Sequence, residues 1–247
     1  MLTPSTVLIT GGSGGIGSAV AHASLECGYW VINLDLAEPR QQQFISSPRF
    51  TTLIVDVNRR SEFRKALARI PEQFPSVVGL VSCAGSRPSL STFEDLTEED
   101  WLGTFRSHLG GLIVAAQEAS QLMNSSQGGA IVHVSSVTAY QPGRAFDYSA
   151  AKAGVVNLTQ SLAAEFINKN IRVNAVAPGW TDTDFLKKPG RDLSQLKSVL
   201  PGGKFLQPTD IAKVILFLLS EQAVSVNGSV ICCDGGYSAL AGLRAYA

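Results

Sequence analysis

The sequence predicts an α/β protein with one doubly wound domain, in which a mostly parallel sheet of about seven strands is flanked by helices. Short apolar runs that suit buried strands alternate with stretches of helical spacing along all 247 residues. No internal repeat and no linker-like stretch interrupts this alternation, so a single domain over residues 1–247 is expected. A glycine-rich turn directly after the first apolar run joins the first strand to a helix.

The first half of the chain contains four of the expected strands. Helical spacing begins at Ala19 and ends near Gly28, a residue type that often terminates helices, and it returns across residues 61–74. An acid, Asp35, stands at the end of the second strand. Strands are expected at residues 7–9, 30–34, 52–55 and 77–81, and a loop or short helix at residues 37–50.

The second half supplies three more strands. Thr97 and the three acids after it are typical of a helix start, and a long helix to about residue 123 is expected, with a bend at Gly110 and Gly111. Right-handed crossovers place the carboxyl ends of parallel strands on one edge, where ligands bind. Strands are expected at residues 131–136, 171–176 and 229–233, helices at 148–168 and 209–220, and irregular structure at 182–207.

Composition narrows the classes of function. Twenty basic and twenty acidic residues cancel, so no charge excess indicates a nucleic acid or an anionic membrane as partner. Charged residues make up 16% of the chain, which favours extensive burial, including burial between subunits. The chain has neither a membrane-length apolar run nor a signal-peptide pattern, so a cytoplasmic location is expected. The four cysteines lack metal-ligand spacing and are expected to be reduced thiols, with no metal bound.

The turn Thr-Gly-Gly-Ser-Gly-Gly-Ile-Gly favours a dinucleotide. Because Gly11, Gly15 and Gly17 have no side chains, the backbone can turn tightly and bring its N–H groups to a pyrophosphate at the helix N-terminus. Asp35 can accept hydrogen bonds from both ribose hydroxyls, and it would repel a 2′-phosphate. No basic residue follows Asp35 directly, and Gly14 leaves no cation inside the turn. The pattern favours NAD(H) over NADP(H); the alternative for Asp35 is a solvated loop acid.

Residues 131–152 hold the candidate catalytic groups. The strand ends in Ser135 and Ser136, and Tyr148 and Lys152 share one helix face because they are four residues apart. To act as a base near pH 7, a phenol needs a pKa about three below its usual value of about 10, which corresponds to about 4 kcal/mol. A lysine cation and a positively charged cofactor ring would both lower this pKa. Alone, a Tyr-x-x-x-Lys pair also occurs by chance in many helices.

Two other enzyme classes lack their motifs. The chain contains no Gly-x-x-x-x-Gly-Lys-Ser/Thr loop for a nucleoside triphosphate. Neither Ser135 nor Ser136 is embedded in the Gly-x-Ser-x-Gly pattern of serine hydrolases, and His133 lies inside an expected strand.

Taken together, the motifs resemble those of the short-chain dehydrogenase/reductase family, in its branch of chains of this length. The resemblance covers nearly the whole chain and follows the family's order of motifs, namely the glycine turn, Asp35, Asp56-Val57, Ala84-Gly85, the strand-end serines, Tyr148-x-x-x-Lys152 and the run from Ile171 to Gly179. It implies a Rossmann-type fold and the interconversion of a secondary alcohol and a ketone by hydride transfer to or from the nicotinamide of NAD(H), without a metal.

The resemblance also implies roles for individual residues. Tyr148 would be the general acid/base, Lys152 would lower the pKa of the phenol and bind the nicotinamide ribose, and Ser136 would hydrogen bond to the substrate oxygen. The cofactor would be bound by Tyr148 and Lys152 together with Gly11, Ser13, Gly14, Gly15, Ile16, Gly17, Asp35, Leu36, Asp56, Val57, Ala84, Gly85, Pro178, Gly179, Thr181 and Thr183.

The chain departs from the family pattern at the catalytic serine. The family's spacing from serine to tyrosine is one residue longer than the spacing from Ser136 to Tyr148, so strict counting selects Ser135. Alignment of the strand end selects Ser136. We prefer Ser136 because a loop shortens more easily than a strand changes register.

Two further departures lie behind the catalytic groups. The family's Asn-Asn-Ala-Gly motif begins here with Ser82 and Cys83. The family's helix asparagine, which binds a water linked to the lysine, falls at His108. His108 would also act in catalysis, as a proton relay, since imidazole titrates near neutrality; alternatively it only fills space or meets a backbone carbonyl.

The sequence leaves the substrate open. Residues 184–207 would form a lid, and sugars or polyols, hydroxyacyl thioesters, steroids and cyclic alcohols are candidates. Family members commonly form tetramers through the helices at 98–123 and 148–168 and through the C-terminal strand, so a homotetramer is expected. The alternative function is a dinucleotide-binding regulatory or scaffold protein with impaired catalysis. The intact serine, tyrosine and lysine argue against that alternative.

Overall fold

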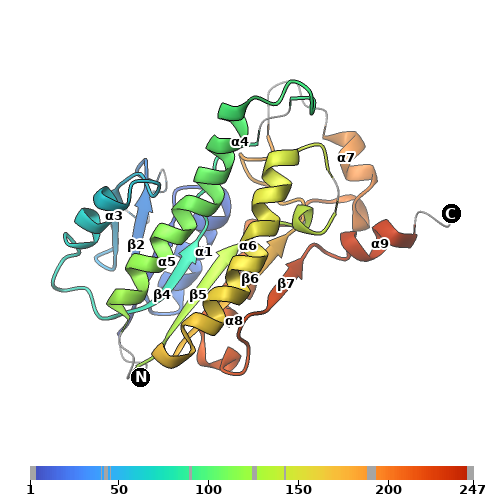
Figure 1. The fold of residues 1–247 in the computed structure, drawn as a ribbon. Coiled ribbons are helices and arrows are strands. Elements are labelled where there is room, and N and C mark those ends of the chain that lie inside the picture. Colours follow the sequence, from blue (N-terminus) through green and yellow to red (C-terminus); the bar gives the residue numbers. More distant parts are fainter. Residues whose placement is uncertain are drawn as a thin grey trace.

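The computed structural model describes residues 4–39, 41, 44, 46–88, 91–123, 127–141, 143–187 and 193–243 (Figure 1). Within these residues, seven strands form one sheet in the order β3-β2-β1-β4-β5-β6-β7, and all neighbouring strands are parallel. The predicted doubly wound sheet is therefore confirmed, and it is parallel throughout. The strands are β1 (Thr6–Thr10), β2 (Trp30–Asp35), β3 (Phe50–Ile54), β4 (Val77–Ser82), β5 (Gly129–Val134), β6 (Ile171–Pro178) and β7 (Val230–Cys233).

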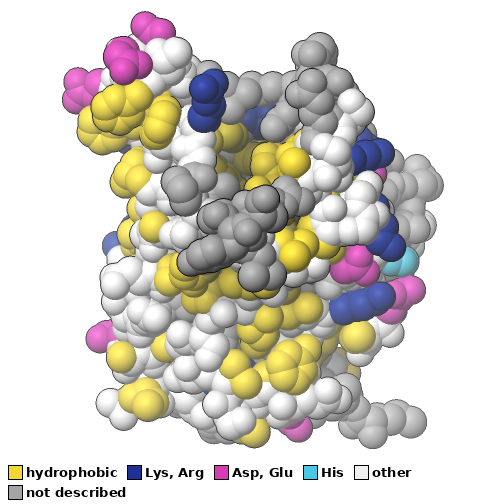
Figure 2. All heavy atoms as spheres, turned by 90° about the vertical axis from the view of Figure 1, so that its right-hand side faces the viewer, with side chains coloured by type: hydrophobic (Ala, Val, Ile, Leu, Met, Phe, Trp, Pro, Cys, Tyr) yellow, Lys and Arg dark blue, Asp and Glu magenta, His cyan; other side chains and the backbone are white. Residues whose placement is uncertain are grey.

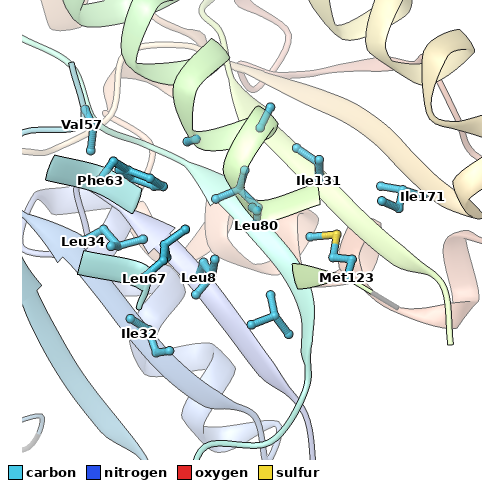
Figure 3. Close-up of a cluster of buried hydrophobic side chains, with 14 of the residues drawn as sticks. Leu8, Ile32, Leu34, Val57, Phe63, Leu67, Leu80, Met123, Ile131 and Ile171 are labelled. Atoms are coloured by element: carbon cyan, nitrogen blue, oxygen red, sulfur yellow. The ribbon is translucent and has the colours of Figure 1, made fainter. Parts of the chain in front are cut away.

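Helices cover both faces of the sheet, so the central strands are apolar on both sides. In β1, Leu8 packs against the layer of α3, α5 and α6 (Figure 3), whereas Val7 and Ile9 pack against α1 and α8. The helices are α1 (Gly15–Glu26), α3 (Arg60–Leu67), α4 (Glu98–Phe105), α5 (Gly111–Leu122), α6 (Phe146–Glu165), α7 (Ser194–Ser198), α8 (Pro208–Leu219) and α9 (Tyr237–Leu243).

The long helix predicted for residues 97–123 is interrupted by a π-helical turn at Arg106–Gly110. Thr97 caps its start as expected: the Thr97 side chain accepts from the Asp100 N–H, and the Asp100 carboxylate accepts from the Thr97 N–H. The irregularity begins four residues before the glycine pair and ends at its first member, Gly110. At Gly111, a Cβ would lie 2.8 Å from Val57 Cγ2, so this glycine lets the helix pack closely on the loop after β3.

Other boundaries differ from the sequence-based expectation by a few residues. The helix predicted over 61–74 ends at Leu67, because a proline at residue 71 disfavours helical backbone before it. Residues 182–207 contain α7 and a 3₁₀ turn at Pro201–Gly203, and residues 188–192 lie outside the described part. In the part of the chain that the structure describes, no helix has both the length and the apolar character needed to cross a membrane.

Candidate active site

One cavity of about 1140 Å³ lies along the carboxyl ends of the strands, the edge at which parallel α/β sheets bind ligands. All residues predicted from the sequence for catalysis and for cofactor binding line this cavity. They come from the segments that follow β1 to β6 and from α1, α6 and the π-helical turn. The topology therefore brings together residues that are up to about 170 positions apart in the sequence.

The glycine turn lies at one end of this cavity, between β1 and α1. Gly11 has a φ of +71°, and a Cβ there would lie 2.7 Å from the backbone nitrogen of Ala84. A Cβ at Gly15 would lie 2.4 Å from Thr183 Cγ2. Glycine is thus required at both positions, because the turn passes directly against the loops after β4 and β6.

The last residues of β2 hold the turn by side-chain hydrogen bonds. The Asn33 Oδ1 accepts from the Gly12 N–H at 2.9 Å, and the Asp35 Oδ2 accepts from the Ser13 N–H at 2.9 Å. The Asp35 Oδ1 accepts from the Leu36 N–H at 2.7 Å. These bonds fix the direction of the Asp35 carboxylate at the cavity wall. Asn33 was missed by the sequence reasoning; its signal was an amide inside an otherwise apolar strand.

Lys152 and Ser135 tie α6 to the end of β5. The buried Lys152 ammonium donates to the Val134 carbonyl at 2.7 Å, and the Ser135 hydroxyl donates to the Lys152 carbonyl at 2.9 Å. Burial lowers the pKa of Lys152 to about 8. Because the Ser135 hydroxyl is used within the fold, Ser136 is the serine available to the cavity.

Ser136 and Lys152 both lie close to Tyr148. Burial raises the pKa of Tyr148 to about 12, and the hydrogen bond from Ser136 acts in the opposite direction. The Lys152 Nζ is 5.5 Å from the centroid of the Tyr148 ring and donates to a backbone carbonyl instead of to the phenol. Burial thus outweighs the hydrogen bond from Ser136, and the expected lowering of this pKa by Lys152 and a positively charged cofactor ring stays a prediction.

His108 packs edge-on against Tyr148, with ring centroids 5.0 Å apart. Its Nε2–H donates to the Ser86 carbonyl at 2.9 Å, and its buried Nδ1 has no hydrogen-bond partner among the described residues. Gly85 makes room for the ring, since a Cβ there would lie 2.3 Å from the imidazole Cε1. Burial, followed by the charge of Lys152, lowers the pKa of His108 to about 3. The expectation that this imidazole titrates near neutrality is wrong, and the ring does meet a backbone carbonyl.

Because the His108 imidazole is buried and neutral, it should make the free energy of unfolding depend on pH in the acid range. Because the pKa of His108 is about 3 when folded and about 6.5 when unfolded, the unfolded chain binds one more proton between these pH values. The free energy of unfolding should therefore fall as the pH falls from 6.5 towards 3, by up to about 1.4 kcal/mol per pH unit for this residue. His133 in β5 is also buried with a pKa of about 3 and adds a second such contribution.

The matched experiment is urea unfolding of the wild type and of His108→Asn at pH 6.5, 6.0, 5.5 and 5.0. In the variant, the free energy of unfolding should depend less steeply on pH, by the slope that corresponds to about one proton. His22→Asn is the control, since His22 is on the exposed side of α1, and its slope should not decrease. An unchanged slope in His108→Asn would show that the imidazole is not buried and neutral.

Arg87, which the sequence reasoning did not single out, lines the cavity together with the first residues of the predicted lid. The Arg87 guanidinium donates to the Asp184 carbonyl, and Phe185 lies 5.9 Å from the Tyr148 ring. Of the lid residues that the structure describes, only 184–186 line the main cavity. Residues after α7 instead form an apolar cluster and line a second cavity of about 400 Å³. No signal in the sequence singles out Arg87, because its partner is a backbone carbonyl 97 residues away.

Comparison with known proteins agrees with this arrangement. The family model described as enoyl-(acyl carrier protein) reductase matches residues 11–238. The chain belongs to the short-chain dehydrogenase/reductase family. Curated relatives that match over nearly their whole length are oxidoreductases, so the predicted family is confirmed.

Three proteins illustrate the range of this dehydrogenase/reductase family. An NAD-dependent glycerol dehydrogenase from Listeria innocua is 33% identical over 242 residues, covering 96% of this chain and 95% of that protein. A 3-oxoacyl-(acyl-carrier-protein) reductase FabG from Thermotoga maritima is 33% identical, covering 93% of this chain and 96% of its own. The structure of ElxO with NADP bound is 29% identical with a TM-score of 0.88, covering 96% of this chain and 100% of that one. The dehydrogenase and the reductase are both oxidoreductases with different substrates, and the glycerol dehydrogenase and ElxO differ in cofactor.

Proposed function

We propose that the protein interconverts a secondary alcohol and a ketone by hydride transfer, with NAD(H) as the cofactor and Tyr148 as the proton donor and acceptor. One observation carries the proposal: a single cavity runs from the glycine turn to Tyr148, so a dinucleotide on the turn would place its reactive ring beside the phenol. Gly11 to Gly17 and Asp35 would hold the adenosine and pyrophosphate, and Lys152 and Thr183 would hold the nicotinamide half.

In reduction, the nicotinamide when bound supplies a hydride to the carbonyl carbon of the substrate. Tyr148 gives its proton to the carbonyl oxygen, and Ser136 stabilises the negative charge that develops there. A phenol with a pKa of about 12 is fully protonated at neutral pH, so it is ready to act as the acid. In the reverse direction the phenolate is needed, and the Lys152 cation together with the oxidised ring favours it.

NAD(H) is proposed because of the charges at the adenosine end of the cavity. Asp35 and Asp56 line this end, whereas the described cations that line the cavity, Arg87 and Lys152, belong to the substrate end. A 2′-phosphate beside the Asp35 carboxylate would meet a like charge without a compensating cation. The NAD-dependent relative supports this choice, and the NADP-bound ElxO structure provides the competing case to test.

The substrate should be a small carbonyl compound or alcohol with an apolar part. Near Tyr148 the cavity wall is formed by Trp180, Phe185 and Leu186, and its polar groups include Ser107 and Thr138. Polyols and 3-oxoacyl thioesters are both compatible with the relatives. The substrate class is therefore best chosen by experiment among these and cyclic ketones.

The test uses NADH carrying deuterium at C4 of the nicotinamide and a panel of dihydroxyacetone, acetoacetyl thioester and cyclohexanone-type ketones. Direct hydride transfer predicts an alcohol that carries the label on its carbinol carbon, detected by mass spectrometry. NADH binding without turnover of any member, and without reverse oxidation of the alcohols, would favour the regulatory or scaffold alternative.

We also propose a homotetramer. Several large apolar side chains are exposed on α4, α5 and the start of α6, namely Trp101, Leu102, Ile113, Leu122 and Phe146. Figure 2 shows further hydrophobic side chains spread over the side of the molecule on which α7 and α9 lie. Two such faces are enough to join four copies with closed symmetry. Sedimentation velocity at micromolar concentration should give the mass of four chains, and a monomer would contradict the proposal.

A further inference from the structure

We propose that Thr138 is a positioning residue that makes the Ser136 hydroxyl an obligatory hydrogen-bond donor towards the reacting oxygen. This inference rests on the proposed oxidoreductase function, and it adds a residue that the sequence motifs do not single out. Thr138 lies two residues after Ser136, in the 3₁₀ turn Val137–Ala139 that follows β5, and both residues line the cavity.

Two hydrogen bonds from Thr138 converge on one atom. The Thr138 N–H donates to the Ser136 Oγ at 3.2 Å, and the Thr138 hydroxyl donates to the same oxygen at 3.0 Å. The N–H contact is the ordinary cap of this short turn. The hydroxyl contact is additional, because the turn is already capped without it.

The hydrogen-bonding capacity of Ser136 then determines its role. A serine hydroxyl has one proton to donate and two lone pairs that accept. Thr138 occupies both lone pairs, so the only capacity left to Ser136 is its proton. The hydrogen bond from Ser136 to Tyr148 uses that proton, and the same proton is available to a substrate oxygen beside the phenol.

The arrangement suits a developing oxyanion. A hydroxyl whose lone pairs are free can rotate and present an acceptor, which would repel negative charge on the substrate. With its lone pairs occupied, Ser136 can meet the substrate oxygen only as a donor, and preorganised donors of this kind stabilise charge most effectively. A hydroxyl that itself accepts a hydrogen bond is also a stronger donor, because hydrogen bonds in a chain polarise one another.

The experiment compares Thr138→Val, which keeps the shape and the backbone N–H, with Thr138→Ser, which restores a hydroxyl. With the best substrate of the panel, Thr138→Val should lower kcat about five-fold, the size of one net hydrogen bond, and leave the KM for NADH unchanged. Thr138→Ser should recover most of the loss. Thr138→Ala serves as a second variant without the hydroxyl should the valine variant fold poorly, and melting temperatures identify that case.

A double substitution separates positioning from a general structural effect. In a Ser136→Ala background, adding Thr138→Val should cause no further loss of kcat, since the group that Thr138 orients is gone. Full activity in Thr138→Val, or losses of kcat that multiply in the double variant, would overturn the positioning role of Thr138 and leave the proposed function standing. Absence of turnover in the wild type itself would overturn the proposed function and the positioning role with it.

Discussion

Tyr148→Phe is expected to lower kcat/KM by about a thousandfold, within the range that a general acid/base contributes. The substitution removes one oxygen atom from a buried ring and leaves the edge-on contact with His108 and the contact with Phe185 in place. Of its titratable neighbours, His108 is neutral near pH 7, and the Lys152 ammonium is held by the Val134 carbonyl, so neither should replace the phenol as the proton donor. The loss should appear in kcat, measured from NADH absorbance at saturating substrate.

Tyr140→Phe provides a matched control. Tyr140 directly follows the 3₁₀ turn Val137–Ala139. It is 54% exposed and does not line the cavity, so the variant should retain wild-type turnover. NADH fluorescence should show that Tyr148→Phe still binds the cofactor with at most a small change in affinity. Equal turnover in wild type and Tyr148→Phe would mean that another group transfers the proton.

Asp35→Asn is expected to reduce the preference for NADH over NADPH by two to three orders of magnitude. Loss of charge-assisted hydrogen bonds to the ribose costs about 2 kcal/mol, or about thirtyfold in the KM for NADH. At the same time, removal of the like charge should improve the use of NADPH. Asparagine keeps an oxygen that can accept from the Ser13 N–H, so the glycine turn should hold its shape.

The measurement is kcat/KM for both cofactors with one substrate, in the wild type and in the variant. Glu38→Gln is the control: it removes a charge from the same exposed loop at a residue that does not line the cavity. Its cofactor preference should match that of the wild type. A wild type that prefers NADPH, or a preference that Asp35→Asn leaves unchanged, would contradict the proposed role of Asp35.

The architecture could be predicted because each signal acts over a short range of sequence. The fully buried run in β1 and the glycines after it are local features, and the order of strands follows from handed crossovers. The ends of the helices were less predictable. The π-helical turn at Arg106–Gly110 has no local signature, since it depends on how the helix packs against the loops after β3 and β4.

The residues of the site were also predictable, because motifs at strand ends converge on one edge of the sheet. The pKa values of these residues could not be predicted from the sequence. Charge rules alone suggested a lowered pKa for Tyr148 and a neutral-range pKa for His108, whereas burial dominates both. Burial depends on the whole chain, and the hydrogen bond from Thr138 to Ser136 likewise appears only when the turn after β5 is built.

The two hydrogen bonds that join α6 to the end of β5 have an evolutionary consequence. The hydrogen bonds from the Lys152 ammonium to the Val134 carbonyl and from the Ser135 hydroxyl to the Lys152 carbonyl attach the proton-transfer groups to the sheet. The cluster around Leu186, Leu200 and Phe205 belongs to a separate segment that shares none of these bonds. Mutations can therefore accumulate in that segment and change which molecules enter, while the catalytic geometry is inherited intact. Divergence of substrate among relatives that keep one chemistry is the expected outcome of this division.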